Sequence, residues 1–330
     1  MNSSEFPANA SWIGPLGGLS AAVLYSLTNI ALRVSADVDP YLVSAVKATP
    51  TVLVLGPFLA FVAIRGGRVL ATRERFPQFL LASFLAQVVG NVGFQRALAH
   101  IGLAASVPIT LGSIIIGGAV LGLWLLKEPV GKRKLFAMAM LIASVVVLSL
   151  TPGGGSDTAI TPTDVLKGSF WAALSGFSYS FFGVTARQLL QNGVRASTTM
   201  FVSGSVGFIV LWSYSLLGLS AEAFEATTSR AWLFMSLAGV LNFAAFIGIT
   251  VSLRLLPVVA VNLINASQVA MAAVAGVLIF DEPLTTSLIL GILLTLSGLI
   301  LLAGRDSTEL KTEPDELVSA SPSLDGEQIN

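Results

Sequence analysis

The chain has 330 residues, of which 54% are hydrophobic and 11% are charged, and its net charge is zero. Soluble domains carry about 25% charged residues, so these charges are too few for a water-facing surface of this size. A net charge of zero produces no long-range electrostatic field that would attract nucleic acid. The lack of cysteine excludes disulfides and thiolate sites. The single histidine, His100, leaves few ligands for a zinc site and few partners for a catalytic serine. We therefore expect an integral membrane protein without nucleic-acid partner, cofactor, metal or catalytic residue.

Ten stretches of the chain are long and apolar enough to be transmembrane helices, which need about 20 mostly apolar residues each. Charged and turn-forming residues separate them. In chain order the stretches cover Ile13–Arg33, Tyr41–Ile64, Phe76–Leu98, Ile101–Leu126, Lys134–Leu150, Gly168–Leu190, Thr198–Leu219, Ala231–Leu253, Pro257–Phe280 and Thr285–Leu302. The sequence thus predicts an all-α integral membrane protein with ten transmembrane helices.

The two ends of the chain are polar, and the basic residues predict on which side they lie. Residues 1–11 lack the basic region of a cleaved signal peptide, and residues 304–330 are acidic, polar and predicted to be disordered. If the N-terminus is cytoplasmic, thirteen of the 18 Lys and Arg residues fall in cytoplasmic segments and four in outer ones. Because basic residues accumulate in cytoplasmic loops, both termini are predicted to be cytoplasmic.

The sequence contains an internal repeat, which becomes visible when the chain is aligned with itself at an offset of 154 residues. It brings residues 125–129 onto 279–283, so that Glu128-Pro129 falls on Glu282-Pro283, and it brings Ser113 onto Ser267. Each half then holds five helices, and an odd number means that the second copy enters the membrane from the opposite side. We expect a first repeat at 12–151, an outer linker at 152–166 and a second repeat at 167–303. Such inverted repeats are common in secondary transporters, whose sites lie between the repeats.

With these features the sequence resembles the drug/metabolite transporter superfamily, EamA type, over about residues 12–303. The likeness is carried by Ala99–Ser149 and Ser252–Ala303, each with a small-residue-rich helix, a Glu-Pro turn and a last apolar helix. Family turns often have a glycine before the glutamate, which is absent in both turns here. Lys47 stands where family members often have Arg or Lys. The resemblance implies a ten-helix transporter of small metabolites, often an exporter, and names no substrate.

Lys47 is the one charge predicted to lie well inside the bilayer, seven residues after Pro40 and thus roughly 10 Å deep at about 1.5 Å per residue. A buried ammonium costs about 2.5–3.5 kcal/mol on insertion scales. Lys47 is therefore predicted to face a polar cavity with a partner or an anionic substrate group. The alternative is that its long side chain reaches the outer interface.

Amide and phenol side chains at membrane depth are the other candidates for substrate binding. Gln87, Asn91 and Gln95 recur every four residues and are predicted to share a helix face, either as interhelical hydrogen-bonding groups or along a substrate path. The ninth stretch carries Asn262, Asn265 and Gln268 on one face. The predicted substrate-binding set is Lys47, Tyr25, Asn29, Gln87, Asn91, Gln95, Tyr179, Asn242, Asn265 and Gln268.

The predicted depths of these candidates in the membrane agree with the predicted symmetry. Asn29, Lys47, Asn91 and Gln95 fall in the outer half and Asn265 in the inner half. Gln87, Tyr179, Asn242 and Gln268 fall near the middle. A two-fold axis in the membrane plane relates an outer cluster in one repeat to an inner cluster in the other. The pattern favours a central cavity that opens alternately to each side.

Every Asp and Glu falls in a loop, in a tail or at a helix end, so the sequence offers no midplane carboxylate as a proton carrier. Facilitated diffusion or exchange is therefore favoured over proton coupling. Glu128 and Glu282 are interpreted as helix-boundary residues. The spacings Gly118-x-x-x-Gly122 and Ala272-x-x-x-Gly276 predict close helix packing inside the protein, with a homodimer contact as the alternative.

The favoured function is transport of a small polar metabolite by alternating access in the plasma (inner) membrane, with an amino-acid or related metabolite, anionic or zwitterionic, as exported or facilitated substrate. One alternative is an antiporter of phosphorylated or nucleotide-linked sugars, which usually needs more than one buried cation. A non-transporting scaffold or receptor is the alternative from another class, and it does not need two halves with matched polar clusters.

Overall fold

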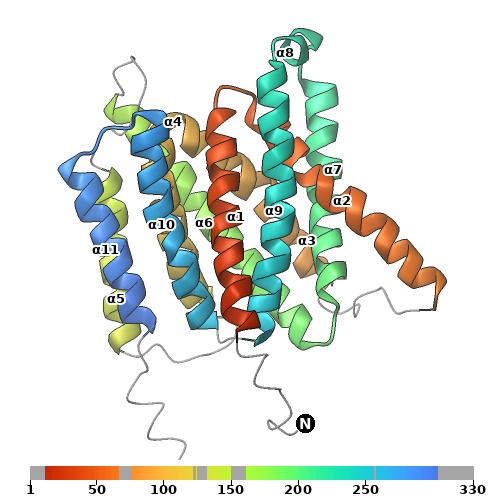
Figure 1. The fold of residues 1–330 in the computed structure, drawn as a ribbon, viewed down its shortest axis with the longest axis horizontal. Coiled ribbons are helices and arrows are strands. Elements are labelled where there is room, and N and C mark those ends of the chain that lie inside the picture. The colour runs from red at the N-terminus through yellow and green to blue at the C-terminus, as the bar shows by residue number, and fades with distance from the viewer. Residues whose placement is uncertain are drawn as a thin grey trace, which may run out of the picture.

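The computed structural model describes residues 12–66, 76–121, 124, 132–149, 161–255 and 258–303 of the chain. All elements in these ranges are helices (Figure 1). They are α1 (Ile13–Val34), α2 (Pro40–Ile64), α3 (Phe76–Phe84), η3 (Leu85–Asn91), α4 (Val92–Leu121), α5 (Lys132–Ser149), α6 (Pro162–Gln191), α7 (Ala196–Gly218), α8 (Ala221–Glu225), α9 (Ser229–Leu255), α10 (Val258–Phe280) and α11 (Thr286–Ala303). Each predicted apolar stretch overlaps at least one of these helices, and the short α8 was not predicted.

The third and fourth predicted stretches follow each other directly as helices that meet at a kink, with two local changes of helix geometry. Residues Leu85–Asn91 form the π-helical segment η3 between α3 and α4. Within α4 the chain breaks at Gly102, whose φ of 73° and ψ of −175° are not helical. Because an L-residue with a side chain rarely adopts such a φ, glycine is required at this break. Gly102 thus separates the third from the fourth span.

Five helical stretches in the described ranges are long and apolar enough to cross a membrane. They are Ile13–Val34, Pro40–Ile64, Phe76–Gly118, Ala196–Gly218 and Ser229–Ser252. Phe76–Gly118 has 43 residues, enough for two spans at about 20 residues each. Leu135–Leu148, Ser267–Phe280 and Thr286–Gly298 are shorter apolar helices. The all-α membrane fold is thereby confirmed, although not every one of the ten predicted spans is resolved as a full-length apolar helix.

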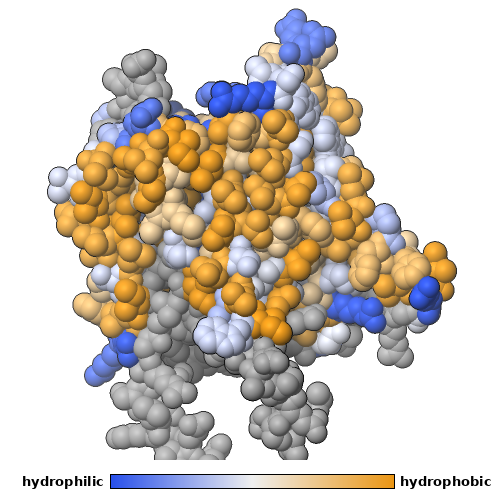
Figure 2. All heavy atoms as spheres, viewed as in Figure 1, coloured by the Kyte–Doolittle hydropathy of each residue, from blue (hydrophilic) through white to orange (hydrophobic). Residues whose placement is uncertain are grey.

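The lateral surface of the bundle is apolar. Figure 2 shows hydrophobic side chains over the middle of one face, and hydrophilic ones gathered at the end where α8 lies and at the far tip of α2. Leu217 is 88% exposed and Leu278 is 75% exposed. Soluble monomers rarely expose so large an apolar surface, whereas lipid tails solvate it without cost.

Helix pairing follows a two-fold relation between the halves. α2 packs against α7, α4 against α10, and α5 against α11, so that equivalent helices meet. α1 packs against α9, while α6 packs against η3 and α4, so a first helix meets a third helix twice. The start of α1 and the end of α11 lie at one end of the bundle, opposite the end that carries α8 (Figure 1). We call the latter the α8 end.

Close approach of α4 and α6 depends on glycine at position 176. A Cβ atom there would press against the carbonyl oxygen of Thr110 and lie 2.6 Å from the Cβ of Ser113. Gly183, two turns further along α6, has nothing within 4 Å of its Cβ position. One helix therefore provides a tightly packed glycine and an open one.

We predict opposite effects for the same substitution at these two positions. Gly176→Ala should lower the free energy of unfolding by about 1–3 kcal/mol through overpacking. Gly183→Ala should raise it by up to about 1 kcal/mol, because alanine is the better helix former. Thermal unfolding of both variants in the same detergent tests this, and equal effects would contradict the α4–α6 packing.

Candidate functional site

The π-helical segment η3 positions two of the predicted amides. Its Gly90 allows the ring of Tyr179 to approach, since a Cβ there would lie 2.9 Å from Cε1 of that ring. The hydroxyl of Ser175 donates a 2.7 Å hydrogen bond to the Gly90 carbonyl. α6 thus packs directly on η3, and Gln87 and Asn91 lie in this segment. Single π turns inside α-helices often occur at functional sites.

A continuous chain of hydrogen bonds joins four helices at this segment. Lys47 of α2 donates from Nζ to Oδ1 of Asn91 at 2.7 Å, and the Tyr179 hydroxyl of α6 donates to the same oxygen at 2.6 Å. Asn91 Nδ2 donates to Gln87 Oε1 at 2.6 Å, and Gln87 Nε2 donates to the hydroxyl of Ser203 in α7 at 3.1 Å. We call these five residues the Lys47 network.

Lys47 is buried without an acidic partner in the described structure. Lys47 is 8% exposed, and neither the Arg33–Glu282 ion pair nor the His100–Asp164 contact in the described ranges includes it. Its backbone carbonyl and Pro50 pack against Gly239 of α9, each within about 3.0 Å of the Cβ position there. An ammonium held by one neutral acceptor in a low-dielectric interior remains strongly attractive to an anion.

One of the predicted residues makes contacts of a different kind. Gln95, 2% exposed, donates from Nε2 to the carbonyls of Leu32 and Ser35 at 3.0 and 3.1 Å. It therefore binds the last turn of α1 and does not join the Lys47 network. For Gln95 the structure thus shows the interhelical hydrogen bonding that the sequence left open beside a substrate path.

The remaining candidates line neighbouring helices. Gln268 donates to Asn265 at 3.2 Å within α10, and the side chain of Asn262 lies outside the described residues. Tyr25 and Asn29 of α1 and Asn242 of α9 are half-buried. The described hydrogen bonds of the Lys47 network do not include these residues.

Two residues of the structure, Ser203 and Glu282, make notable contacts and were not among the predicted site residues. Ser203 ends the Lys47 network, and a lone serine in an apolar helix gives no sequence signal. Glu282 was interpreted as a boundary residue only, yet it is 4% exposed. Its partners lie 179 and 249 residues away, so no local pattern could reveal them.

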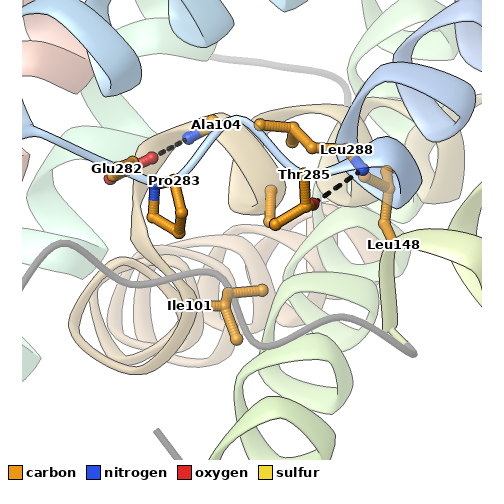
Figure 3. Close-up of a pocket in the computed structure, with 8 residues that line it drawn as sticks. Ile101, Ala104, Leu148, Glu282, Pro283, Thr285 and Leu288 are labelled. Carbon is orange, nitrogen blue, oxygen red and sulfur yellow. Dashed lines mark hydrogen bonds between the residues drawn. The ribbon is translucent and has the colours of Figure 1, made fainter. Parts of the chain in front are cut away.

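Glu282 ties three segments together at the α8 end. Its Oε1 accepts from the amide of Leu103 at 2.6 Å, and its Oε2 accepts from the amide of Ala104 at 2.7 Å. Nε of Arg33 donates to Oε1 at 3.3 Å. Figure 3 shows the Glu282–Ala104 contact beside Pro283, above Ile101. We call Glu282, Arg33 and the two amides the Glu282 clamp.

Comparison with known proteins assigns the sequence to a family. The model of the EamA-like transporter family matches residues 12–150 and 166–304. The chain belongs to the EamA-like transporter family. Both predicted halves are thus matched by the same family model, and this membership confirms the resemblance found in the sequence. The protein is accordingly a multi-pass membrane transporter.

Two individual proteins are similar to this member of the family. Probable purine permease 5 of Arabidopsis thaliana is 21% identical over 233 residues, which cover 67% of this chain and 64% of the relative. The chain thus spans less than two thirds of that relative's length. A solved structure titled "Crystal structure of protein" superposes with a TM-score of 0.58 at 17% identity, over 88% of this chain and 96% of that chain. At this identity the likeness shows the fold alone.

We predict that Asn91 and Lys47 are energetically coupled. Asn91→Leu should lower the free energy of unfolding by about 1–3 kcal/mol, because two buried donors lose their acceptor. Adding Lys47→Met should restore part of the loss, since the unpaired cation is then gone. Unfolding of the single and double variants in detergent measures the coupling.

The matched control is Gln95→Leu combined with Lys47→Met. Within the described residues Gln95 bonds Leu32 and Ser35, whereas Lys47 bonds Asn91, so the two share no hydrogen-bond partner. Its effect should add to that of Lys47→Met within about 0.3–0.5 kcal/mol. Additive effects for the Asn91 pair as well would contradict the network.

Proposed function

We propose that this EamA-family transporter carries a small polar metabolite by alternating access, and that the Lys47 network binds the negatively charged group of that metabolite. The observation that carries the proposal is the burial of the Lys47 ammonium against a neutral amide, with no carboxylate partner in the described residues. Inserting such a charge into the membrane costs about 2.5–3.5 kcal/mol, and charged residues at this depth usually have a functional role.

The Lys47 network is suited to binding a negatively charged group because two of its hydrogen-bond donors point to the same place. Lys47 and Tyr179 both donate to the same Asn91 oxygen. A carboxylate entering at this point would replace a neutral acceptor by a charged one, and charge-assisted hydrogen bonds are roughly twice as strong as neutral ones. The amides of Gln87 and Asn91 and the hydroxyl of Ser203 would bind the polar remainder of the substrate.

The favoured substrate is an amino acid or a related carboxylate-bearing metabolite, anionic or zwitterionic. Phosphorylated or nucleotide-linked sugars fit less well, because these substrates usually require more than one buried cation and the network contains one. A polar, hydrogen-bonded interior also argues against a scaffold or receptor without transport, for which a purely apolar centre would suffice.

A purine base is the second candidate substrate. It is favoured by the similarity to probable purine permease 5, which covers 67% of this chain. The amides of Gln87 and Asn91 offer donors and acceptors, and Tyr179 adds an aromatic ring. Under this candidate Lys47 would bind a carbonyl oxygen or ring nitrogen and not a full negative charge.

We further propose that the protein lies in the plasma (inner) membrane with both termini cytoplasmic. The α8 end then faces outward. This orientation is supported by the distribution of Lys and Arg, which places thirteen of the 18 on the cytoplasmic side. Export or facilitated diffusion of the metabolite is the expected mode.

The first test is a thermal-shift screen of the purified full chain against amino acids, organic anions, sugar phosphates and purine bases. A ligand at 100 times its Kd should stabilise the folded state by about 2.7 kcal/mol. Lys47→Met should abolish the shift for one anionic class. Asn91→Asp, nearly isosteric, should weaken the same ligand at least about tenfold, because the new carboxylate neutralises Lys47.

Lys167→Met is the matched control, since Lys167 is exposed near the start of α6. It should leave the shift unchanged. An anion that stabilises Lys47→Met as well as the wild type would contradict the role of Lys47. A purine base that stabilises both proteins equally would favour the second candidate.

The absence of a midplane carboxylate from the sequence predicts transport without proton coupling through such a group. In proteoliposomes, the substrate found by the screen should equilibrate down its own gradient or exchange with internal substrate. An imposed pH gradient alone should not concentrate it. Uptake above equilibrium with the pH gradient as the only driving force would contradict this prediction.

A further inference from the structure

Glu282 connects the two family-matched halves at the α8 end. Arg33, Leu103 and Ala104 belong to the half at 12–150, whereas Glu282 lies in the half at 166–304. The carboxylate is carried by the connection between α10 and α11, and its own amide donates to the carbonyl of Gly276 at 3.0 Å. A single side chain therefore joins α1, α4 and α10.

The carboxylate fits a space that two glycines leave open. A Cβ at Gly102 would clash with Oε1 of Glu282, and a Cβ at Gly276 would lie 2.5 Å from Oε2. The break at Gly102 also frees the amides of Leu103 and Ala104 from their helical partners, and Glu282 accepts both. A carboxylate at a helix N-terminus is favoured by the helix dipole as well.

Two hollows of the surface adjoin the clamp. A cleft of about 370 Å³ at the α8 end is lined by Arg33, Asp37 and Arg230 among others. A small cavity of about 10 Å³ is lined by Glu282, Ala105 and Leu148 among others. Arg33, whose side chain is 14% exposed, is part of both the cleft and the clamp.

We propose that Glu282 is a positioning residue for transport: its contacts with Arg33 and the start of the α4 segment after Gly102 hold the α8 end closed, and they break when the carrier opens on that side. Alternating access requires contacts between the repeats that form in one state and break in the other. A charge-assisted contact at helix ends meets this need, because water can solvate its separated groups. The inference rests on the family's transport activity and is independent of Lys47 and of substrate class.

The experiment uses the absence of cysteine from the chain, which makes any introduced thiol unique. Ala105→Cys places a thiol at the small cavity beside Glu282, at a residue that is 6% exposed. The purified full chain is treated with a water-soluble maleimide, and the labelling rate is measured. In the Glu282→Gln background this rate should rise at least about tenfold, because losing charge-assisted bonds raises the population of the open state.

Asp281→Asn is the matched control for charge. Asp281 precedes Glu282, is exposed and has a φ of 52°, which asparagine tolerates. It should leave the labelling rate of Ala105→Cys unchanged. Arg33→Gln removes the ion pair and keeps the two amide contacts, so it should give an intermediate rate.

Ala82→Cys, at a fully buried position in α3, distinguishes opening from unfolding. Under the proposal, Glu282→Gln accelerates labelling of the thiol at position 105 and leaves the thiol at position 82 slow. Acceleration at both positions would overturn it, since Glu282 would then hold the whole fold. An unchanged rate at position 105 in both Glu282→Gln and Arg33→Gln would overturn it as well. Substrate binding that survives in Lys47→Met would not affect either result, so the two proposals fail separately.

Discussion

Inside a bilayer each backbone amide and carbonyl must be bonded within the protein, because lipid offers no hydrogen-bonding partner. This constraint makes every described element a helix, and it also governs the places where helix geometry changes. At Gly102 the break frees two amides, and Glu282 accepts both. In η3 the carbonyl of Gly90 accepts from Ser175. Each irregular point is therefore satisfied by a side chain from another segment.

The π-helical segment η3 and the break at Gly102 also contain the backbone and side chains that contact Lys47 and Glu282. Local departures from helix geometry cost stability and persist only where surrounding contacts impose them. The π turn carries Gln87 and Asn91, which meet the ammonium of Lys47, and the Gly102 break carries the amides that meet the carboxylate of Glu282. The interior cation and the α8-end anion thus each lie against a segment whose backbone is irregular.

The two charged groups are compensated very differently. Glu282 has a guanidinium and two backbone amides, so its burial is balanced by charge and hydrogen bonds. Lys47 has one neutral acceptor among the described residues. Removing a charged group from water is costly unless it is paired. The first arrangement suits a contact within the protein, and the second leaves an attraction for a group from outside.

The apolar stretches, the two repeats and the burial of Lys47 could be predicted from the amino-acid sequence, because they depend on length, periodicity and composition along the chain. The sequence also placed Gln87 and Asn91 on the right helix. Tertiary packing was needed to show that Asn91 bonds Lys47 while Gln95 binds α1, since both partners come from other helices and no local pattern identifies them. Likewise, the sequence indicates only a helix boundary at Glu282, because its partners lie 179 and 249 residues away and come within bonding distance only when the two halves pack together.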